Sequence, residues 1–247
     1  MALKVALNYS PNFNSKKRTP KELKFIIFHY TGMKSESEAI DKLIDIQSEV
    51  SSHYLIKNNG TIIKLVPDLY VAWHAGKSSW KNYKSLNQKS IGIEITNPGH
   101  EFSYKKFSNK QISSLLKLSK FLLKKYNINS KNILGHSDIA PQRKKDPGEK
   151  FPWKFLAQKK IGLWHKLTKK ELIKNRNSKI NQIEKKFFFN NLFKIGYSKT
   201  TLKGFNKDRY LKNLTEAFQR RFRQELVNGK IDQECLLISK NLIKRYY

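Results

Sequence analysis

The strongest structural signal in this 247-residue chain is the stretch Leu23-Lys24-Phe25-Ile26-Ile27-Phe28-His29-Tyr30. It is an almost continuous run of β-branched and aromatic residues, which is typical of a central strand that is buried on both faces of a sheet. The run places His29 at the end of this strand. Because a lone histidine at a strand end is more often a hydrogen-bonded structural group than a ligand, the stretch alone predicts a fold and not a function.

Apolar runs separated by turn signals continue on the C-terminal side of this strand. The turn Asn58-Asn59-Gly60 joins two of them, and Asn and Gly accept the positive φ that a tight hairpin needs. The further elements expected in this region are a helix around residues 37–48, strands at 53–57, 61–66 and 90–95, and a helix with one apolar face over 111–126. Strands followed by helices in this order predict an α/β fold with a mixed central β-sheet flanked by helices.

The sequence changes character after residue 166. Residues 168–179 are rich in Lys and Asn and hold few apolar residues, which suits a linker or an exposed helix. Three apolar clusters follow, of which the second lies around Phe218 and the third around Leu242. They predict a small three-helix domain. The predicted parts are therefore residues 1–166, a linker at 167–180 and a helical domain at 181–247.

The composition limits the partners and the metal chemistry. The formal charge of +31 attracts nucleic acid, membranes and acidic cell-wall polymers alike. The lysines are spread over the whole chain without a basic stripe of interleaved aromatic residues, so we expect no nucleic-acid partner. The single cysteine, Cys235, excludes an intrachain disulfide and a thiolate cluster, and a metal site would need histidine and carboxylate ligands. No apolar run approaches the roughly 20 residues of a membrane-spanning helix.

Three separated stretches hold the residue types of a hydrolytic zinc site. They are Phe28-His29-Tyr30-Thr31, Gly92-Ile93-Glu94-Ile95, and Gly135-His136-Ser137-Asp138-Ile139-Ala140-Pro141 continuing to Lys144-Lys145-Asp146-Pro147-Gly148. Two histidines and one carboxylate can bind zinc and leave its fourth position open, as in catalytic sites. Asp138 is a rival ligand to Asp146, or it caps and braces the loop through backbone contacts. The spacing alone is compatible with a metal site and equally with a set of structural polar groups.

Over residues 20–165 these stretches resemble the zinc-dependent N-acetylmuramoyl-L-alanine amidases of the type-2 family, relatives of the peptidoglycan recognition proteins. The resemblance implies that His29, His136 and Asp146 bind Zn²⁺, and it matches Glu94 and Lys144 to the catalytic glutamate and lysine of the family. In such a site Glu94 would take the proton of the attacking water and return it to the departing amine. The Lys144 cation would stabilise the negative oxygen of the tetrahedral intermediate.

Four more residues are candidates for substrate contacts. Tyr30 follows the first histidine, and Asn97 and Arg143 are placed to hold polar groups of the sugar or the peptide, since a guanidinium suits a stem-peptide carboxylate. His74 lies in a segment that resembles the family's, as does His53, and neither is a zinc ligand there. Both are expected to line the groove or to orient the metal ligands from the side away from the metal. For His53, a purely structural role in packing is an equal alternative.

The stretch from Leu214 to Asp232 resembles the three-helix peptidoglycan-binding module, on its Ala217-Phe218-Gln219-Arg220 sequence and a later Gly229-Lys230-Ile231-Asp232. A generic amphipathic helix is the alternative, and Phe218 and Phe222 are core residues in both cases. Such a module would tether the catalytic site to its polymer and raise the effective substrate concentration.

The resulting expectation is a monomeric zinc amidase that hydrolyses the bond between N-acetylmuramic acid and L-alanine of peptidoglycan or muropeptides. The alternative is a non-catalytic peptidoglycan sensor, which the filled ligand positions and Glu94 disfavour. The wall-binding-like module favours the cell envelope, whereas residues 1–7 are too short for the apolar core of a secretory signal and favour a cytoplasmic enzyme of muropeptide recycling.

Overall fold

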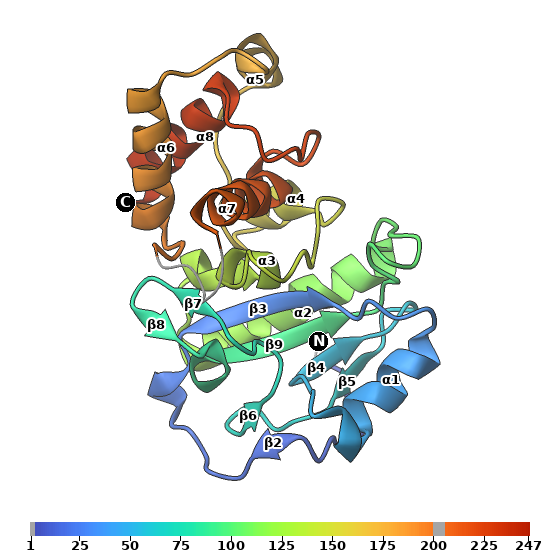
Figure 1. Cartoon of the computed structure of the whole chain (residues 1–247). Helices are drawn as coiled ribbons and strands as arrows, with labels where there is room; N and C mark the ends of the chain where they lie inside the picture. Colours follow the sequence, from blue (N-terminus) through green and yellow to red (C-terminus); the bar gives the residue numbers. More distant parts are fainter. Residues whose placement is uncertain (1–2, 200–205) are drawn as a thin grey trace.

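The computed structural model describes residues 3–199 and 206–247, which form a central sheet with helices on both of its faces (Figure 1). Within these residues the main sheet has the strand order β1-β5-β4-β9-β3-β10. The pair β4–β5 is antiparallel and every other neighbouring pair is parallel. This mixed α/β architecture confirms the predicted fold class. The strands of this sheet are β1 (Ala6–Leu7), β3 (Phe25–Tyr30), β4 (Tyr54–Ile56), β5 (Ile62–Lys64), β9 (Ser90–Ile95) and β10 (Ile133–Gly135).

Short elements connect these strands and helices. Two small antiparallel sheets pair β2 (Phe13–Asn14) with β6 (Val71–Ala72), and β7 (Ser79–Trp80) with β8 (Tyr83–Lys84). The 3₁₀ helices are η1 (Pro20–Glu22), η2 (Ile46–Ser48), η3 (Leu86–Lys89) and η4 (Ser130–Asn132). The α-helices are α1 (Glu36–Ile44), α2 (Asn109–Tyr126), α3 (His136–Ile139), α4 (Trp153–Gln158), α5 (Lys169–Asn175), α6 (Gln182–Ile195), α7 (Lys207–Phe222) and α8 (Gln233–Tyr246).

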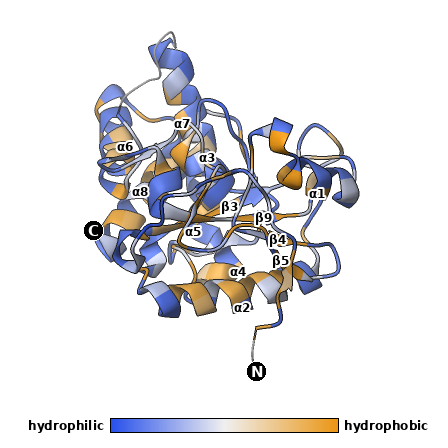
Figure 2. Cartoon of the chain, turned by 90° about the horizontal axis from the view of Figure 1, so that it is seen from below, coloured by the Kyte–Doolittle hydropathy of each residue, from blue (hydrophilic) through white to orange (hydrophobic). Residues whose placement is uncertain are grey.

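Helix α2 covers one face of the sheet (Figure 2). It begins where the Ser108 hydroxyl accepts the Gln111 N–H, and it ends at Asn127, whose φ of 50° lies in the left-handed region. Its apolar side, including Leu115, packs against alternate residues of the central strands, among them Ile93. Because side chains alternate along a strand, the intervening residues of β9 point to the opposite face, and these include Glu94.

The C-terminal helices α6, α7 and α8 pack against one end of the opposite face (Figure 1). The other end of that face holds polar residues, among them His29 and Glu94. A single apolar cluster joins Phe25 and Ile27 of β3 to Phe188 of α6 and Phe218 of α7. Phe218 and Phe222 are buried, as expected. The predicted boundary between a catalytic domain and a helical domain therefore crosses a continuous core, and the division at residues 167–180 stays a prediction.

The expected elements match the observed ones to within a few residues. The strand at 90–95 is β9, the helix at 111–126 is the larger part of α2, and α1 with η2 occupies 36–48. The segment predicted as a linker or an exposed helix contains α5, a helix without buried residues. Among the described residues, no helix combines the length and the apolar character needed to cross a membrane.

Candidate metal centre

Strands β3 and β9 bring the first candidate ligand beside the candidate base. The two strands are parallel neighbours, and their register pairs His29 with Glu94. Both residues lie near the carboxyl ends of their strands, on the face opposite α2. Residues that are far apart in the sequence thus become lateral neighbours through strand pairing alone.

The other two candidate ligands lie on the segment that follows β10. This strand pairs with β3 so that Gly135 lies opposite Phe28, and His136 begins α3 directly after it. The Ser137 N–H donates to the Asp146 carbonyl at 2.8 Å, which joins α3 to the loop that carries the carboxylate. A side chain at Gly135 would meet the Pro147 ring, with only 2.7 Å between the added Cβ and the Pro147 Cδ. Glycine therefore lets the two segments approach.

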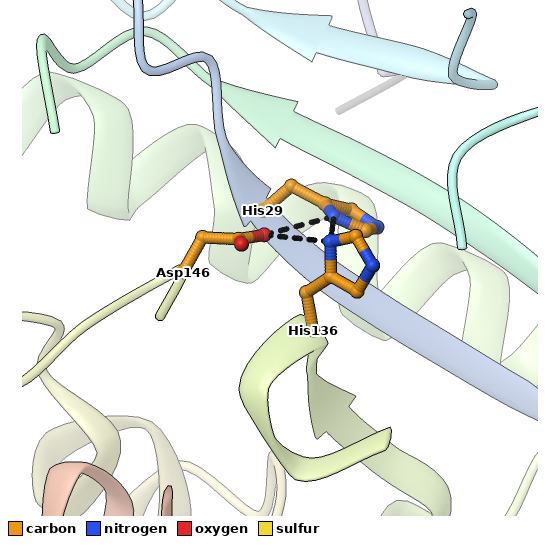
Figure 3. Close-up of side chains that lie close together, drawn as sticks. All are labelled: His29, His136 and Asp146. Carbon is orange, nitrogen blue, oxygen red and sulfur yellow. Dashed lines mark hydrogen bonds and ion pairs between the residues drawn. The ribbon is translucent and has the colours of Figure 1, made fainter. Parts of the chain in front are cut away.

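Three side-chain atoms of these residues converge on one point (Figure 3). The Nδ1 atoms of His29 and His136 are 2.9 Å apart, and each lies 3.0 Å from Oδ2 of Asp146. Zinc bonds of about 2.0–2.2 Å at tetrahedral angles put neighbouring ligand atoms roughly 3.3 Å apart. The three buried donors therefore fit one small cation with little movement, and they form a His-His-Asp group that could bind a metal.

The opposite nitrogen of each imidazole has its own partner, which leaves Nδ1 free for a cation. The Nε2 of His136 lies 3.2 Å from the carbonyl of Ala75, which can only accept a hydrogen bond. The Nε2 of His29 lies 3.0 Å from Nδ1 of His74. Outer partners of this kind fix the ring orientation and the tautomer of metal-binding histidines. His74 and Ala75, which are consecutive in the sequence, thus contact the Nε2 atoms of the two rings on the side away from the metal group.

The electrostatics of the group favour a neutral His29 ring and an ionised Asp146 carboxylate. Burial, together with the neighbouring His136, lowers the pKa of His29 to about 4. Burial opposes ionisation of Asp146, yet the charge and hydrogen bond of His136 and the contacts of His29 hold its pKa well below the usual range. Cations bind to deprotonated ligands, so both shifts keep the group ready for a metal at neutral pH.

The metal group opens into a pocket of about 350 Å³ that Glu94 and Lys144 also line. Burial, reinforced by the negative charge of Asp146, raises the pKa of Glu94 well above its usual range. Its Oε2 has no hydrogen-bond partner among the described residues. The positive charge of Lys144 acts in the opposite direction on the pKa of Glu94. A carboxyl group with a raised pKa and a free oxygen, facing a pocket, can take up and release a proton.

The four predicted substrate contacts lie in different surroundings. Tyr30 and Arg143 line the pocket, where the Tyr30 hydroxyl lies 2.9 Å from Nδ1 of His100, and the Arg143 Nε donates to the Lys77 carbonyl at 3.0 Å. His74 also borders the pocket, but its ring is buried behind His29. Asn97 is buried outside the pocket lining, where its amide donates to the Lys105 carbonyl at 2.8 Å. The position of Asn97 therefore suits loop bracing.

Two further residues singled out in the sequence serve as structural supports. Asp138 lies outside the metal group, and its Oδ2 accepts the Gly135 N–H at 2.8 Å, which is the bracing role considered for it. His53 is completely buried, with Nδ1 accepting the Gly92 N–H at 3.0 Å. Ser90, which was not predicted as a site residue, has its hydroxyl 3.2 Å from Nε2 of His74. A serine at a strand start carries no signal of this role.

The chain matches known proteins over most of its length. Residues 19–149 match a family model described as N-acetylmuramoyl-L-alanine amidase. The N-acetylmuramoyl-L-alanine amidase AmiD of Escherichia coli is 36% identical over 236 residues, which are 91% of this chain and 83% of AmiD. The 1,6-anhydro-N-acetylmuramyl-L-alanine amidase AmpD of Haemophilus influenzae is 31% identical over 61% of this chain and 90% of its own length.

Solved structures show the same likeness. The complex of Escherichia coli AmiD with the substrate anhydro-N-acetylmuramic acid-L-Ala-D-gamma-Glu-L-Lys superposes with a TM-score of 0.78 at 34% identity, covering 91% of this chain and 90% of that one. AmpDh3 of Pseudomonas aeruginosa in complex with anhydromuramic pentapeptide also gives a TM-score of 0.78, at 31% identity, with 94% and 97% covered.

An α/β fold with a buried His-His-Asp group that could bind a metal, at the edge of a pocket, is an arrangement typical of metal-dependent hydrolases. The chain belongs to the N-acetylmuramoyl-L-alanine amidase family, since the family model covers more than half of it and AmiD matches nearly all of it. The resemblance to this amidase family is thereby confirmed. The link to peptidoglycan recognition proteins and the peptidoglycan-binding character of the C-terminal helices stay predictions.

Proposed function

We propose that this enzyme uses Zn²⁺ held by His29, His136 and Asp146 to hydrolyse the amide between N-acetylmuramic acid and L-alanine in peptidoglycan or its muropeptide fragments. The observation that carries the proposal is the convergence of three ligand atoms within 3.0 Å of one another beside a pocket that holds Glu94. Two neutral imidazoles and one carboxylate suit zinc and leave room for a fourth ligand.

Zinc in such a site activates a water molecule and polarises the scissile carbonyl. Glu94 would take the proton of the attacking water and pass it to the leaving amine, for which its raised pKa is suited. Lys144 would hold a positive charge beside the carbonyl oxygen as negative charge develops on it. Lys144 has no ion-pair partner among the described residues, so its charge is available to the pocket.

The proposed substrate class rests on the relatives and on the charge of the pocket. AmiD and AmpDh3 are described in complexes with anhydromuramic peptides. Arg143, Lys144 and Lys145 all line the pocket of this chain, and they suit the carboxylates of a stem peptide. We therefore propose a muropeptide, with the peptide carboxylates toward these three cations.

We further propose that the enzyme works as a monomer in the cell envelope, with the C-terminal helices binding peptidoglycan. The support is the resemblance of the sequence between Leu214 and Asp232 to a peptidoglycan-binding module. Cosedimentation of the purified protein with insoluble sacculi, and its partition between cell fractions, would test binding and location. A cytoplasmic recycling enzyme would be found in the soluble fraction and would leave sacculi unbound.

Purified protein incubated with muropeptides should release free stem peptide, detected by mass spectrometry, and a chelator should abolish the release. Glu94→Gln should keep the metal and lose about 10²–10⁴-fold in turnover, because only the proton transfer is removed. His136→Ala should lose the metal itself. The exposed Glu38, on α1, gives the control Glu38→Gln, which should behave as the wild type. Wild-type protein loaded with zinc that releases no peptide would overturn the proposed function.

A further inference from the structure

The C-terminal end of α7 lies against both loop segments that carry candidate metal ligands. Arg221, on the last turn of this helix, forms a buried ion pair with Asp138, two residues after His136. Its second terminal nitrogen donates to the Ile133 carbonyl of β10 at 2.8 Å. Arg221 therefore contacts both β10, which precedes His136, and Asp138, which follows His136 in α3.

A second contact from the same helix end reaches the other loop. The side-chain amide of Gln224 donates to the Glu149 carbonyl at 2.7 Å and to the Phe151 carbonyl at 2.5 Å. These carbonyls belong to the segment that follows Asp146. The two loop-borne ligands thus each have a polar anchor on one short stretch, Arg221 to Gln224, whereas His29 is held within the sheet.

Asp138 has a full set of buried partners. Its Oδ1 accepts the hydroxyl of Tyr197, which follows α6, at 2.7 Å, and its Oδ2 accepts the Gly135 N–H at 2.8 Å. The guanidinium of Arg221 also lies over the Trp153 ring, 4.5 Å from its centre. A buried ion pair adds little net stability compared with apolar packing, but it fixes geometry when its other hydrogen bonds are satisfied.

We infer that the C-terminal helices are part of the metal centre, with Arg221, Gln224 and Tyr197 as positioning residues for the segments that present His136 and Asp146. This inference rests on the proposed metal site and goes beyond it. The helices do more than carry a binding surface, because the ligand spacing depends on their contacts. Replacing a residue that orients metal ligands from outside typically weakens metal affinity by about 10–100-fold.

The test measures zinc affinity in full-length variants by competition with a chromophoric chelator, together with thermal unfolding of the metal-free protein. Arg221→Met removes the anchor of Asp138 and should raise the zinc Kd by about tenfold or more. Gln224→Ala and Tyr197→Phe should raise it by smaller factors. With Co²⁺ in place of zinc, these variants should show a shifted visible absorption spectrum, because the ligand geometry changes.

Arg223 provides a matched control two positions further on. It is equally buried, and its side-chain partners all belong to the C-terminal helices and their connections: Leu226, Asn228, Asp232 and Glu234. Arg223→Met should lower the unfolding temperature as Arg221→Met does, but it should leave the zinc Kd of the folded protein within about twofold and the Co²⁺ spectrum unchanged. The comparison separates positioning from general destabilisation.

The outcomes distinguish this inference from the proposed function. A wild-type protein that binds no zinc overturns both. A wild type that binds zinc, with folded Arg221→Met and Gln224→Ala variants of unchanged Kd and spectrum, overturns only the inference, as does an equal loss of affinity in Arg223→Met. If Arg221→Met does not fold, Tyr197→Phe and Gln224→Ala decide the question on the same two measurements.

Discussion

The tautomer of His29 follows from a directed chain of hydrogen bonds that ends at a backbone carbonyl. The Leu86 carbonyl can only accept, and it takes the Ser90 hydroxyl proton at 2.6 Å. The Ser90 oxygen then accepts from Nε2–H of His74, which leaves Nδ1 of that ring to accept from Nε2–H of His29. Each donor is determined by the one before it, so the chain leaves Nδ1 of His29 unprotonated for the metal.

Ser90→Ala should therefore weaken zinc binding by about tenfold, although the serine is far from the metal. Without the hydroxyl, the His74 ring can take the other tautomer, and ¹⁵N NMR of the imidazole nitrogens should report a mixed population. Ser119 offers the control Ser119→Ala, since its buried hydroxyl has no hydrogen-bond partner among the described residues. An unchanged tautomer and an unchanged zinc Kd in Ser90→Ala would show that the chain does not act in this way.

At the scale of secondary structure, alternate residues of β9 belong to the hydrophobic core and to the candidate site. Its apolar residues face α2, while Ser90, Gly92 and Glu94 face the metal group. The position of Gly92 needs the absence of a side chain, because an added Cβ would lie 2.6 Å from the His74 Nδ1. Gly92 therefore provides the space in which the His74 ring reaches His29.

Gly92→Ala should displace the His74 ring and destabilise the protein by about 1–3 kcal/mol, as overpacking does in a dense core. Zinc affinity should fall with it. Chemical denaturation of four proteins, the wild type, both single variants and Gly92→Ala combined with His74→Ala, gives the coupling energy. With the ring removed, the added methyl group should cost almost nothing. A cost that is the same in both backgrounds would contradict the steric explanation.

The elements and residues that could be predicted are those with a local pattern in the sequence. The strand with His29 and the strand with Glu94 were readable from alternation and from β-branched residues, and resemblance supplied the ligand roles. The sequence predicts no helix at α3, because four residues leave no periodic pattern. The anchors of Asp138, namely Arg221 and Tyr197, could not be predicted, since they reach it only when helices more than 50 residues away in sequence pack on the sheet.

For the molecule as a whole, the buried histidines make stability depend on pH. Burial, with the nearby Arg18 as the next cause, lowers the pKa of His53 to about 3, and burial lowers that of His165 to about 4. Both are neutral in the folded protein at pH 5, whereas an unfolded histidine takes up a proton below about 6.5. Between pH 6.5 and 4 the unfolded chain holds more protons at these two histidines, so their contribution to the free energy of unfolding falls as the pH falls.

Each such histidine should contribute a slope of up to about 1.4 kcal/mol per pH unit in that window. Denaturant unfolding of the metal-free protein at pH 7, 6 and 5 measures the sum. His165→Phe keeps an aromatic ring beside Trp164 but cannot take up a proton, so its stability should fall less steeply than that of the wild type over the same range. The metal ligands are unchanged in this variant. The remaining slope is the net effect of the other buried histidines and of Glu94, whose raised pKa acts in the opposite direction. If His165→Phe loses stability as steeply as the wild type, His165 is protonated in the folded protein.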